Sequence, residues 1–136
     1  KANQESLASG TRVRECLDFA EEIVKTHSIP FLFMTYYNIL YKFGVEDFFI
    51  EAKRIGIKGF IIPDLPPEEG RDFLGLAEKY QIAPILIFAP TSTNERMTQL
   101  ANLGDGFIYC VARRGVTGTK TSFDPAFEDY IKRCLY

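Results

Sequence analysis

Four short apolar runs recur along the chain, and each is bounded by residues that favour turns. They cover residues 31–35, 59–63, 83–88 and 107–111. None of them alternates apolar with polar side chains, which is typical of strands that are buried on both faces of a parallel sheet. The pattern therefore predicts four buried parallel strands.

Apolar residues at helical spacing fill the intervals between these runs. After a weak helical segment at 2–9, one helix face carries Val13, Cys16, Leu17, Ala20, Ile23 and Val24. Later helices are predicted over about 45–54, from Pro67 to about Tyr80, from a Ser92–Glu95 capping box through Ala101, and after Asp124 with Phe127 and Ile131. Residues 36–44 are expected to form a long connection.

Strands and helices thus alternate in four consecutive βα units, with no linker or low-complexity tract between them. Right-handed crossovers between sequential strands place all the helices on one side, so the other face must be closed into a barrel. A doubly wound sheet with helices on both sides is the alternative. The barrel is favoured because the long connections and the Gly-, Pro- and Thr-rich segments all follow strands. We predict an α/β fold, a partial (β/α)8 TIM barrel with four parallel βα units.

The length limits how much of a barrel is present. The chain has 136 residues, whereas a full (β/α)8 barrel takes about 250. It begins at Lys1 without Met and ends at Tyr136 in what reads as an unfinished helix. We therefore expect a single domain, 1–136, that is the central portion of a barrel whose N- and C-terminal parts are absent. Unpaired strand edges and an apolar inner face predict that such a piece self-associates.

Composition narrows the classes of function. The formal net charge of −2 offers no basic surface, so neither nucleic acid nor an anionic membrane is an expected partner. No apolar run approaches the ~20 residues of a membrane span. The cysteines Cys16, Cys110 and Cys134 lack CxxC spacing and are expected to be reduced thiols of a cytoplasmic protein. His27 is the single histidine, so no His-based triad or metal site is expected.

The segment 106–118 carries the strongest chemical signal, because the last strand there runs into a glycine-rich loop. In parallel α/β proteins, ligands bind where strands end and the following loops begin. Gly118 lets backbone N–H groups approach an anion, and Thr117 adds a hydroxyl beside it. A flexible surface turn is the alternative interpretation of the Gly-Val-Thr-Gly motif at 115–118.

Four segments, taken in order, resemble the α subunit of tryptophan synthase, and the resemblance covers essentially the whole chain. They are residues 2–10, 56–69 with Pro-Asp-Leu-Pro-Pro, 89–92, and 109–118 with Tyr109 and Gly-Val-Thr-Gly. The resemblance assigns the strands to the third to sixth of the family's barrel. The chain departs from the family at Ala112 and Arg114, where a Ser and a small residue are usual, and Lys120 follows the motif.

The resemblance implies a lyase of tryptophan biosynthesis. Its reaction is the retro-aldol cleavage of indole-3-glycerol phosphate to indole and glyceraldehyde 3-phosphate, with no cofactor and no metal. A pyridoxal-phosphate β subunit, which receives the indole, is the implied partner. The family's two catalytic carboxylates, a Glu at the end of strand two and an Asp in the next loop, would lie upstream of Lys1. We therefore expect no catalytic residue in this chain, and the 136 residues alone are expected to be inactive.

The same resemblance implies a set of binding residues. The apolar indole pocket would be lined by Met34, Ile61, Pro63, Ile87 and Tyr109, although such residues can also be core in any α/β fold. On loop closure, Thr117 would contact the catalytic Asp and the Gly118 N–H would touch the substrate phosphate. Asp64 would support catalysis, and the surface that meets the β subunit would include Tyr36, Asn38, Asp64 and Pro66.

Two other functions stay open from the sequence. The chain could be an α/β binding or interaction module without catalysis. It could also belong to another phosphate-binding barrel enzyme, such as indole-glycerol-phosphate synthase or a ribulose-phosphate epimerase. Those enzymes rely on Lys or on metal-binding His and Asp at strand ends, and no predicted strand here ends in Lys or His, which argues against that assignment.

Overall fold

The computed structural model describes residues 12–112 and 125–135. The chain divides into two compact units, Lys1–Ala83 and Pro84–Tyr136, and each is described by itself. The expectation that 1–136 behaves as a single domain stays a prediction. Within the described residues, no helix is both long and apolar enough to cross a lipid bilayer.

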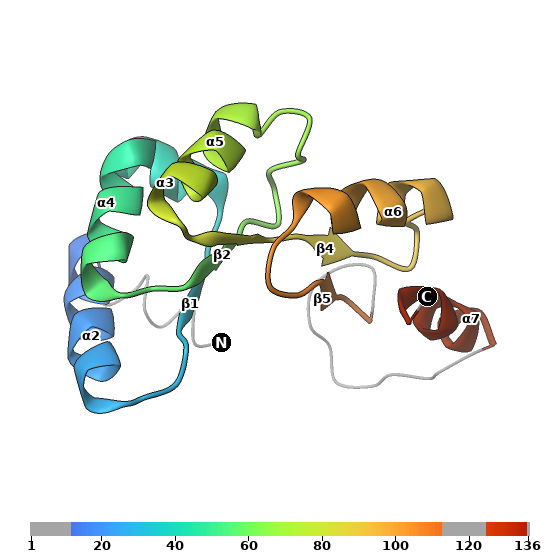
Figure 1. Ribbon diagram of the computed structural model, residues 1–136, viewed down its shortest axis with the longest axis horizontal. Coiled ribbons are helices and arrows are strands. Elements are labelled where there is room, and N and C mark those ends of the chain that lie inside the picture. Colours follow the sequence, from blue (N-terminus) through green and yellow to red (C-terminus); the bar gives the residue numbers. More distant parts are fainter. Residues whose placement is uncertain (1–11, 113–124, 136) are drawn as a thin grey trace. The chain divides into compact units, whose positions relative to one another are not determined.

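Unit 1 alternates helices with short parallel strands, as predicted (Figure 1). Strands β1 (Leu32–Met34) and β2 (Gly59–Ile61) pair in parallel, with Phe33 opposite Phe60. Ala83, the first residue of β3 (Ala83–Ile85), donates from its N–H to the Lys58 carbonyl oxygen at 2.8 Å. The helices are α2 (Val13–Thr26), α3 (Tyr37–Phe43), α4 (Val45–Ile55) and α5 (Arg71–Tyr80).

The core of unit 1 is an aromatic cluster between β2 and the helices that pack on it. The Phe60 ring lies 4.8 Å from that of Phe49 and 5.4 Å from that of Phe48, measured between centroids. Phe73 of α5 closes the cluster at 5.1 Å from Phe49. Burying a phenylalanine side chain stabilises a fold by about 1.5–3 kcal/mol, so this cluster holds α4 and α5 against the strands. Other buried members include Leu17, Leu40, Ala52, Ile55, Ile57, Ala77 and Ile82.

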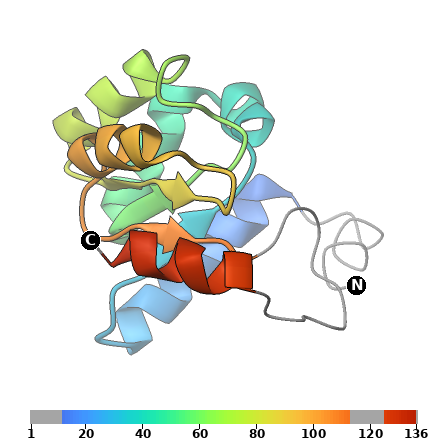
Figure 2. The same ribbon diagram turned by 90° about the vertical axis from the view of Figure 1, so that its right-hand side faces the viewer.

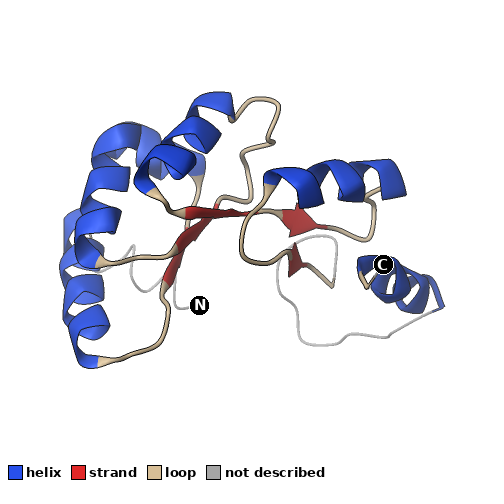
Figure 3. Ribbon diagram, viewed as in Figure 1, coloured by secondary structure: helices blue, strands red, loops and turns tan. Residues whose placement is uncertain are grey.

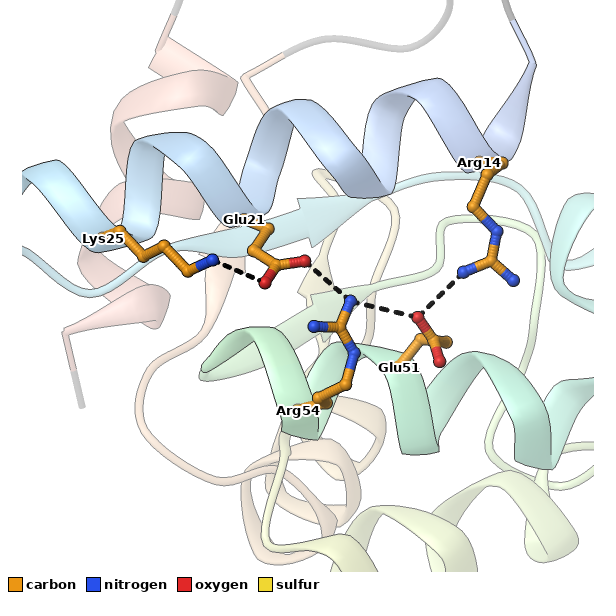
Figure 4. A network of polar contacts seen from close by, with 5 residues as sticks. All are labelled: Arg14, Glu21, Lys25, Glu51 and Arg54. Carbon is orange, nitrogen blue, oxygen red and sulfur yellow. Dashed lines mark hydrogen bonds and ion pairs between the residues drawn. The ribbon is translucent and has the colours of Figure 1, made fainter.

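An ion-pair network joins the outer faces of α2 and α4 (Figure 4). Arg54 lies between two carboxylates, at 2.8 Å from Glu21 Oε2 and 3.3 Å from Glu51 Oε2. Lys25 also contacts Glu21 at 2.7 Å, and Arg14 contacts Glu51 at 2.9 Å. The alternating charges thus add polar contacts between two helices that already pack on the same core.

Unit 2 repeats the βα arrangement, as Figures 2 and 3 show. Strands β4 (Ile87–Phe88) and β5 (Tyr109–Cys110) pair in parallel, and helices α6 (Asn94–Leu103) and α7 (Pro125–Cys134) pack on them. The core of the unit is formed by Phe88, Met97, Leu100 and Tyr130. The parallel pairing predicted for the strands is therefore confirmed in each unit, although the strands are shorter than the apolar runs.

Two predictions, one about a connection and one about a helix start, are wrong. Residues 37–43 form α3 within the predicted connection. Helix α5 begins at Arg71 and not at Pro67. The physical reason for the second difference is a tight turn: the Pro66 carbonyl oxygen accepts from the N–H groups of Glu69 and Gly70, both at 3.0 Å.

The predicted Ser92–Glu95 capping box is also wrong, by one residue. Helix α6 has Thr93 at its N-cap, and the Thr93 hydroxyl accepts from the Arg96 N–H at 3.2 Å. The Ser92 hydroxyl instead accepts from the Ala89 N–H at 3.1 Å, so it stabilises the turn before the helix. Both side chains bind backbone donors, and the turn geometry decides which of them caps the helix.

Candidate functional site

The two strands of unit 1 present different side chains on their two faces. Phe33 and Phe60 are register partners whose rings stack at 6.3 Å, on the face that the helices cover. Successive side chains of a strand point to opposite faces. The next register pair, Met34 with Ile61, therefore points away from the helices. The structure thus brings together two of the residues predicted to line the indole pocket, and Met34 is 55% exposed.

Unit 2 has the same arrangement at its own pair of strands. Phe88 is buried against Met97 and Leu100 of α6, so it marks the face that the helices cover. Ile87 and its register partner Tyr109 precede Phe88 and Cys110 and point the other way. These are the two pocket residues that the sequence predicts for this part of the chain. Tyr109 is 38% exposed, so the prediction that this strand is buried on both faces is wrong.

The remaining predicted binding residues follow the strands. Pro63 is exposed in the turn directly after β2. Thr117 and Gly118, like the rest of the Gly-Val-Thr-Gly motif, lie outside the described residues.

The residues predicted to meet a partner subunit come from two segments that a hydrogen bond holds together. Asp64 Oδ1 accepts from the Tyr37 N–H, 27 residues earlier, at 2.8 Å. This bond satisfies one of the unpaired donors at the start of α3. Consequently the N-terminus of α3 and the turn after β2 are joined into one surface. The four predicted residues on this surface are all exposed; they are Tyr36, Asn38, Asp64 and Pro66.

The strand face that the helices leave open in each unit offers apolar surface for binding. On the strand face that points away from the helices of its own unit, unit 1 carries Met34 and Ile61, and unit 2 carries Ile87 and Tyr109. An apolar strand face suits a flat apolar ring. Across residues 12–112 and 125–135, no cluster of three or more His, Cys, Asp or Glu side chains is arranged to hold a metal ion.

Unit 2 also contains a pocket that the sequence interpretation missed. It has a volume of about 610 Å³ and lies between α6, β4 and α7. Arg133 lines it and donates to the Ser92 carbonyl oxygen at 2.7 Å, so it holds the turn before α6. Tyr130 lies one turn earlier on α7 and is fully buried, whereas Ile131, which the sequence interpretation singled out, is exposed. No motif in the sequence marks Arg133, but the spacing of Phe127, Tyr130 and Cys134 on one helix face is readable.

Comparison with known proteins agrees with this architecture. The profile of the family described as tryptophan synthase alpha chain matches residues 1–135. The tryptophan synthase alpha chain of Desulfotalea psychrophila is 62% identical over 134 residues, and that of Syntrophotalea carbinolica is 52% identical over 134 residues. Each alignment covers 98% of this chain and 53% of the relative. The chain therefore spans about half the length of the curated relatives it matches.

Solved structures give the same result. A chain of the tryptophan synthase α2β2 complex from Pyrococcus furiosus has a TM-score of 0.86 at 32% identity, covering 97% of this chain and 55% of its own length. The tryptophan synthase A-subunit from the same organism has a TM-score of 0.85 at 31% identity, covering 97% of this chain and 54% of its own length.

The parallel βα units and the apolar strand faces define an α/β protein whose fold is part of a (β/α)8 barrel. Because the family profile matches almost the whole chain, the particular barrel can be assigned. The chain belongs to the tryptophan synthase alpha chain family.

Proposed function

We propose that this chain contributes one wall of the substrate pocket of a tryptophan synthase α subunit. The reaction is the retro-aldol cleavage of indole-3-glycerol phosphate to indole and glyceraldehyde 3-phosphate, which makes the whole protein a cytoplasmic lyase of tryptophan biosynthesis. The observation that carries the proposal is that each unit has a register pair on the strand face its own helices leave open, Met34–Ile61 in unit 1 and Ile87–Tyr109 in unit 2, in a chain of this family.

In this proposal the strand face of unit 1 that carries Met34 and Ile61 binds the indole ring. Apolar surface removed from water contributes about 25 cal/mol per Å², and a ring lying on Met34 and Ile61 gains that contact without a hydrogen bond. Pro63 extends the same surface beyond the end of β2. The proton transfers belong to the two carboxylates that the family resemblance places outside this sequence, while Thr117 and Gly118 would meet the catalytic Asp and the phosphate.

We also propose the β subunit of tryptophan synthase as the partner. The surface formed by Tyr36, Asn38, Asp64 and Pro66 supports this, because its four residues are exposed and the Asp64–Tyr37 hydrogen bond fixes its two segments together. One solved relative is the tryptophan synthase α2β2 complex of Pyrococcus furiosus. Preorganised surfaces lose less conformational entropy on association, which favours binding at such a place.

A hybrid protein tests the proposed activity. The aligned half of the Desulfotalea psychrophila alpha chain is replaced by this chain, and indole release from indole-3-glycerol phosphate is measured. We expect the hybrid to release indole, and the 136 residues alone to release none. In the hybrid, Met34→Ala is expected to lower kcat/KM about tenfold, because loss of a few apolar contacts costs about 1–3 kcal/mol.

The matched control for this experiment is Ile50→Ala. Ile50 is, like Met34, an exposed apolar residue of unit 1, but it lies on α4 and not on the strand face. The hybrid with Ile50→Ala should keep the kcat/KM of the unsubstituted hybrid. A folded hybrid without indole release would contradict the proposed activity and would favour a binding module instead. Indole release by the 136 residues alone would contradict the assignment of the catalytic carboxylates.

A further inference from the structure

Two cysteines that are far apart in the sequence meet in unit 2. Cys110 is the last residue of β5 and Cys134 is the last residue of α7. The pKa of the Cys110 thiol is raised first by burial and then by the neighbouring Cys134 side chain, and the pKa of the Tyr130 hydroxyl is raised by burial and then by both cysteines, so the three side chains are neighbours. All three cysteines of the chain are free, so Cys110 and Cys134 are neighbours without a covalent bond.

The backbone explains why the two thiols meet. Cys110 is the register partner of Phe88 across the β4–β5 pair. The Phe88 carbonyl oxygen accepts a hydrogen bond of 2.9 Å from the Tyr130 hydroxyl, which brings α7 to this point of the strands. Cys134 is four residues after Tyr130 on the same helix and therefore lies on the same face. Strand register, a buried hydrogen bond and helical spacing thus all place Cys134 beside Cys110.

Both cysteine residues retain solvent-accessible surface. Cys110 is exposed, and Cys134 is half-buried and forms part of the wall of the 610 Å³ pocket. Lys132 and Arg133 line the same pocket, so a small oxidant that carries carboxylates finds cationic groups beside Cys134. Burial raises the pKa of the Cys110 thiol, so the thiolate that attacks an oxidant is a minor form of this residue at neutral pH.

We propose that Cys110 and Cys134 form a reversible intramolecular disulfide that links β5 to α7. The oxidant is a low-molecular-weight disulfide such as glutathione disulfide. One protein thiolate attacks a sulfur of the oxidant, forming a mixed disulfide and releasing one glutathione thiolate. The second protein thiolate then attacks the protein sulfur of the mixed disulfide and releases the second glutathione. Two electrons pass from the protein to the oxidant, and the two thiol protons end on two molecules of glutathione.

The third cysteine provides an internal control. Cys16 is an exposed thiol on α2 of unit 1. It is expected to react with glutathione disulfide only as a single thiol, which gives a mixed disulfide with glutathione. A difference between Cys16 and the Cys110–Cys134 pair in the same sample therefore reports proximity and not general reactivity.

The test is thiol mapping of the 136-residue protein. The reduced protein is incubated with glutathione disulfide, remaining thiols are blocked with N-ethylmaleimide, and peptides are identified by mass spectrometry. We expect one peptide pair joined through Cys110 and Cys134, and its loss on treatment with dithiothreitol. Mixing ¹⁵N-labelled with unlabelled protein should give no cross-linked pair of mixed label. The Cys16→Ser variant should form the same bond.

Two results would overturn the proposal. The first is a protein in which Cys110 and Cys134 each carry glutathione or maleimide, as Cys16 does, with no joined peptide. The second is a joined peptide that contains both isotopes, because the bond would then connect two chains. Both are measured on the unsubstituted protein, so neither depends on whether a cysteine variant folds. In the variants Cys110→Ser and Cys134→Ser, the remaining cysteine should carry only glutathione or maleimide.

Discussion

The hydroxyl of Tyr130 donates a hydrogen bond of 2.9 Å to the carbonyl oxygen of Phe88, which lies 42 residues earlier in the chain. This contact joins the last described helix to β4 inside a core that also includes Met97 and Leu100. The same carbonyl oxygen accepts from the Val111 N–H at 2.9 Å. One acceptor therefore holds both the partner strand and α7, and burial raises the pKa of the Tyr130 hydroxyl, so the donor stays protonated.

Replacing Tyr130 by Phe should weaken unit 2 modestly. The Phe88 carbonyl oxygen keeps its bond from Val111, so the loss is that of one hydrogen bond, about 1 kcal/mol of unfolding free energy. Tyr130→Ala should cost about 3–5 kcal/mol, because it also leaves a cavity. Urea unfolding measures both. The control is Tyr41→Phe at a side chain that is 73% exposed, which should leave the free energy unchanged; an equal loss there would contradict the assignment.

Alanine substitutions at Gly56, which ends a helix, and at Gly75, which lies inside one, should change the stability of the protein in opposite directions. Gly56 ends α4 in the left-handed region at φ 98°, and an added Cβ would lie 3.3 Å from Val24 Cγ1. Gly56→Ala should therefore destabilise the protein by about 1–2 kcal/mol. Gly75 lies inside α5 with nothing within 4 Å of an added Cβ. Gly75→Ala should stabilise it by about 0.5–1 kcal/mol. Thermal unfolding compares the two, and the same sign for both would contradict this account.

Local patterns predicted the order of the elements, because the strands lie within the apolar runs and the helices lie where apolar residues have helical spacing. They failed where long-range contacts decide. Helix α3 begins where Asp64, far along the sequence, accepts from Tyr37, and nothing within residues 36–44 signals that partner. Ser92 and Thr93 are equally good caps by composition, and only the turn after β4 selects Thr93.

For the candidate site, the sequence predicted which residues share a strand face but not how they are surrounded. Met34 and Tyr109 were expected in buried strands, and both are exposed on the face that the helices leave open. The Cys110–Cys134 contact was not foreseen either, because it combines strand register with the packing of α7. Spacing in one helix can place Cys134 beside Tyr130, but it says nothing of the strand that they meet.

Asp64 should have a structural role that is separable from a role at a partner surface. Asp64→Ala removes the acceptor for the Tyr37 N–H and should cost about 1 kcal/mol of unfolding free energy, as for other caps. Asp64→Asn keeps an acceptor oxygen at the same place and should restore most of that loss. Equilibrium unfolding in urea tests the pair. A loss with Asn as large as with Ala would contradict the capping role.

The same two variants examine the proposed partner surface in the hybrid protein. If Asp64 acts there only by holding α3, binding of the β subunit should follow stability, so Asn restores it. If the carboxylate itself contacts the β subunit, the Asp64→Asn hybrid should bind the β subunit as weakly as the Asp64→Ala hybrid does. Its stability should nevertheless be close to that of the unsubstituted hybrid. Titration of the β subunit by calorimetry separates these outcomes, with Tyr41→Phe as the variant that changes neither.

The ion-pair network between α2 and α4 should make the stability of the protein depend on pH in the acidic range. Hydrogen bonds from Arg54 and then from Lys25 lower the pKa of Glu21 from 4.5 to about 2. A carboxyl whose pKa is lowered in the folded state stabilises the fold above its unfolded pKa, and this contribution is lost as pH falls through the folded value. The midpoint temperature of thermal unfolding should therefore decrease as the pH is lowered from about 4.5 to about 2.

Substitution isolates this carboxylate from the others of the chain. Glu21→Gln removes the titration, so its unfolding midpoint should fall less steeply than that of the unsubstituted protein across the same interval. Glu22→Gln is the matched control, since the ion pairs identified among the described residues use Glu21 and not its neighbour. Added salt should reduce the difference, because the pair lies at the surface and is screened. Parallel acid profiles for Glu21→Gln and the unsubstituted protein would contradict the stabilising role of the Glu21–Arg54 pair.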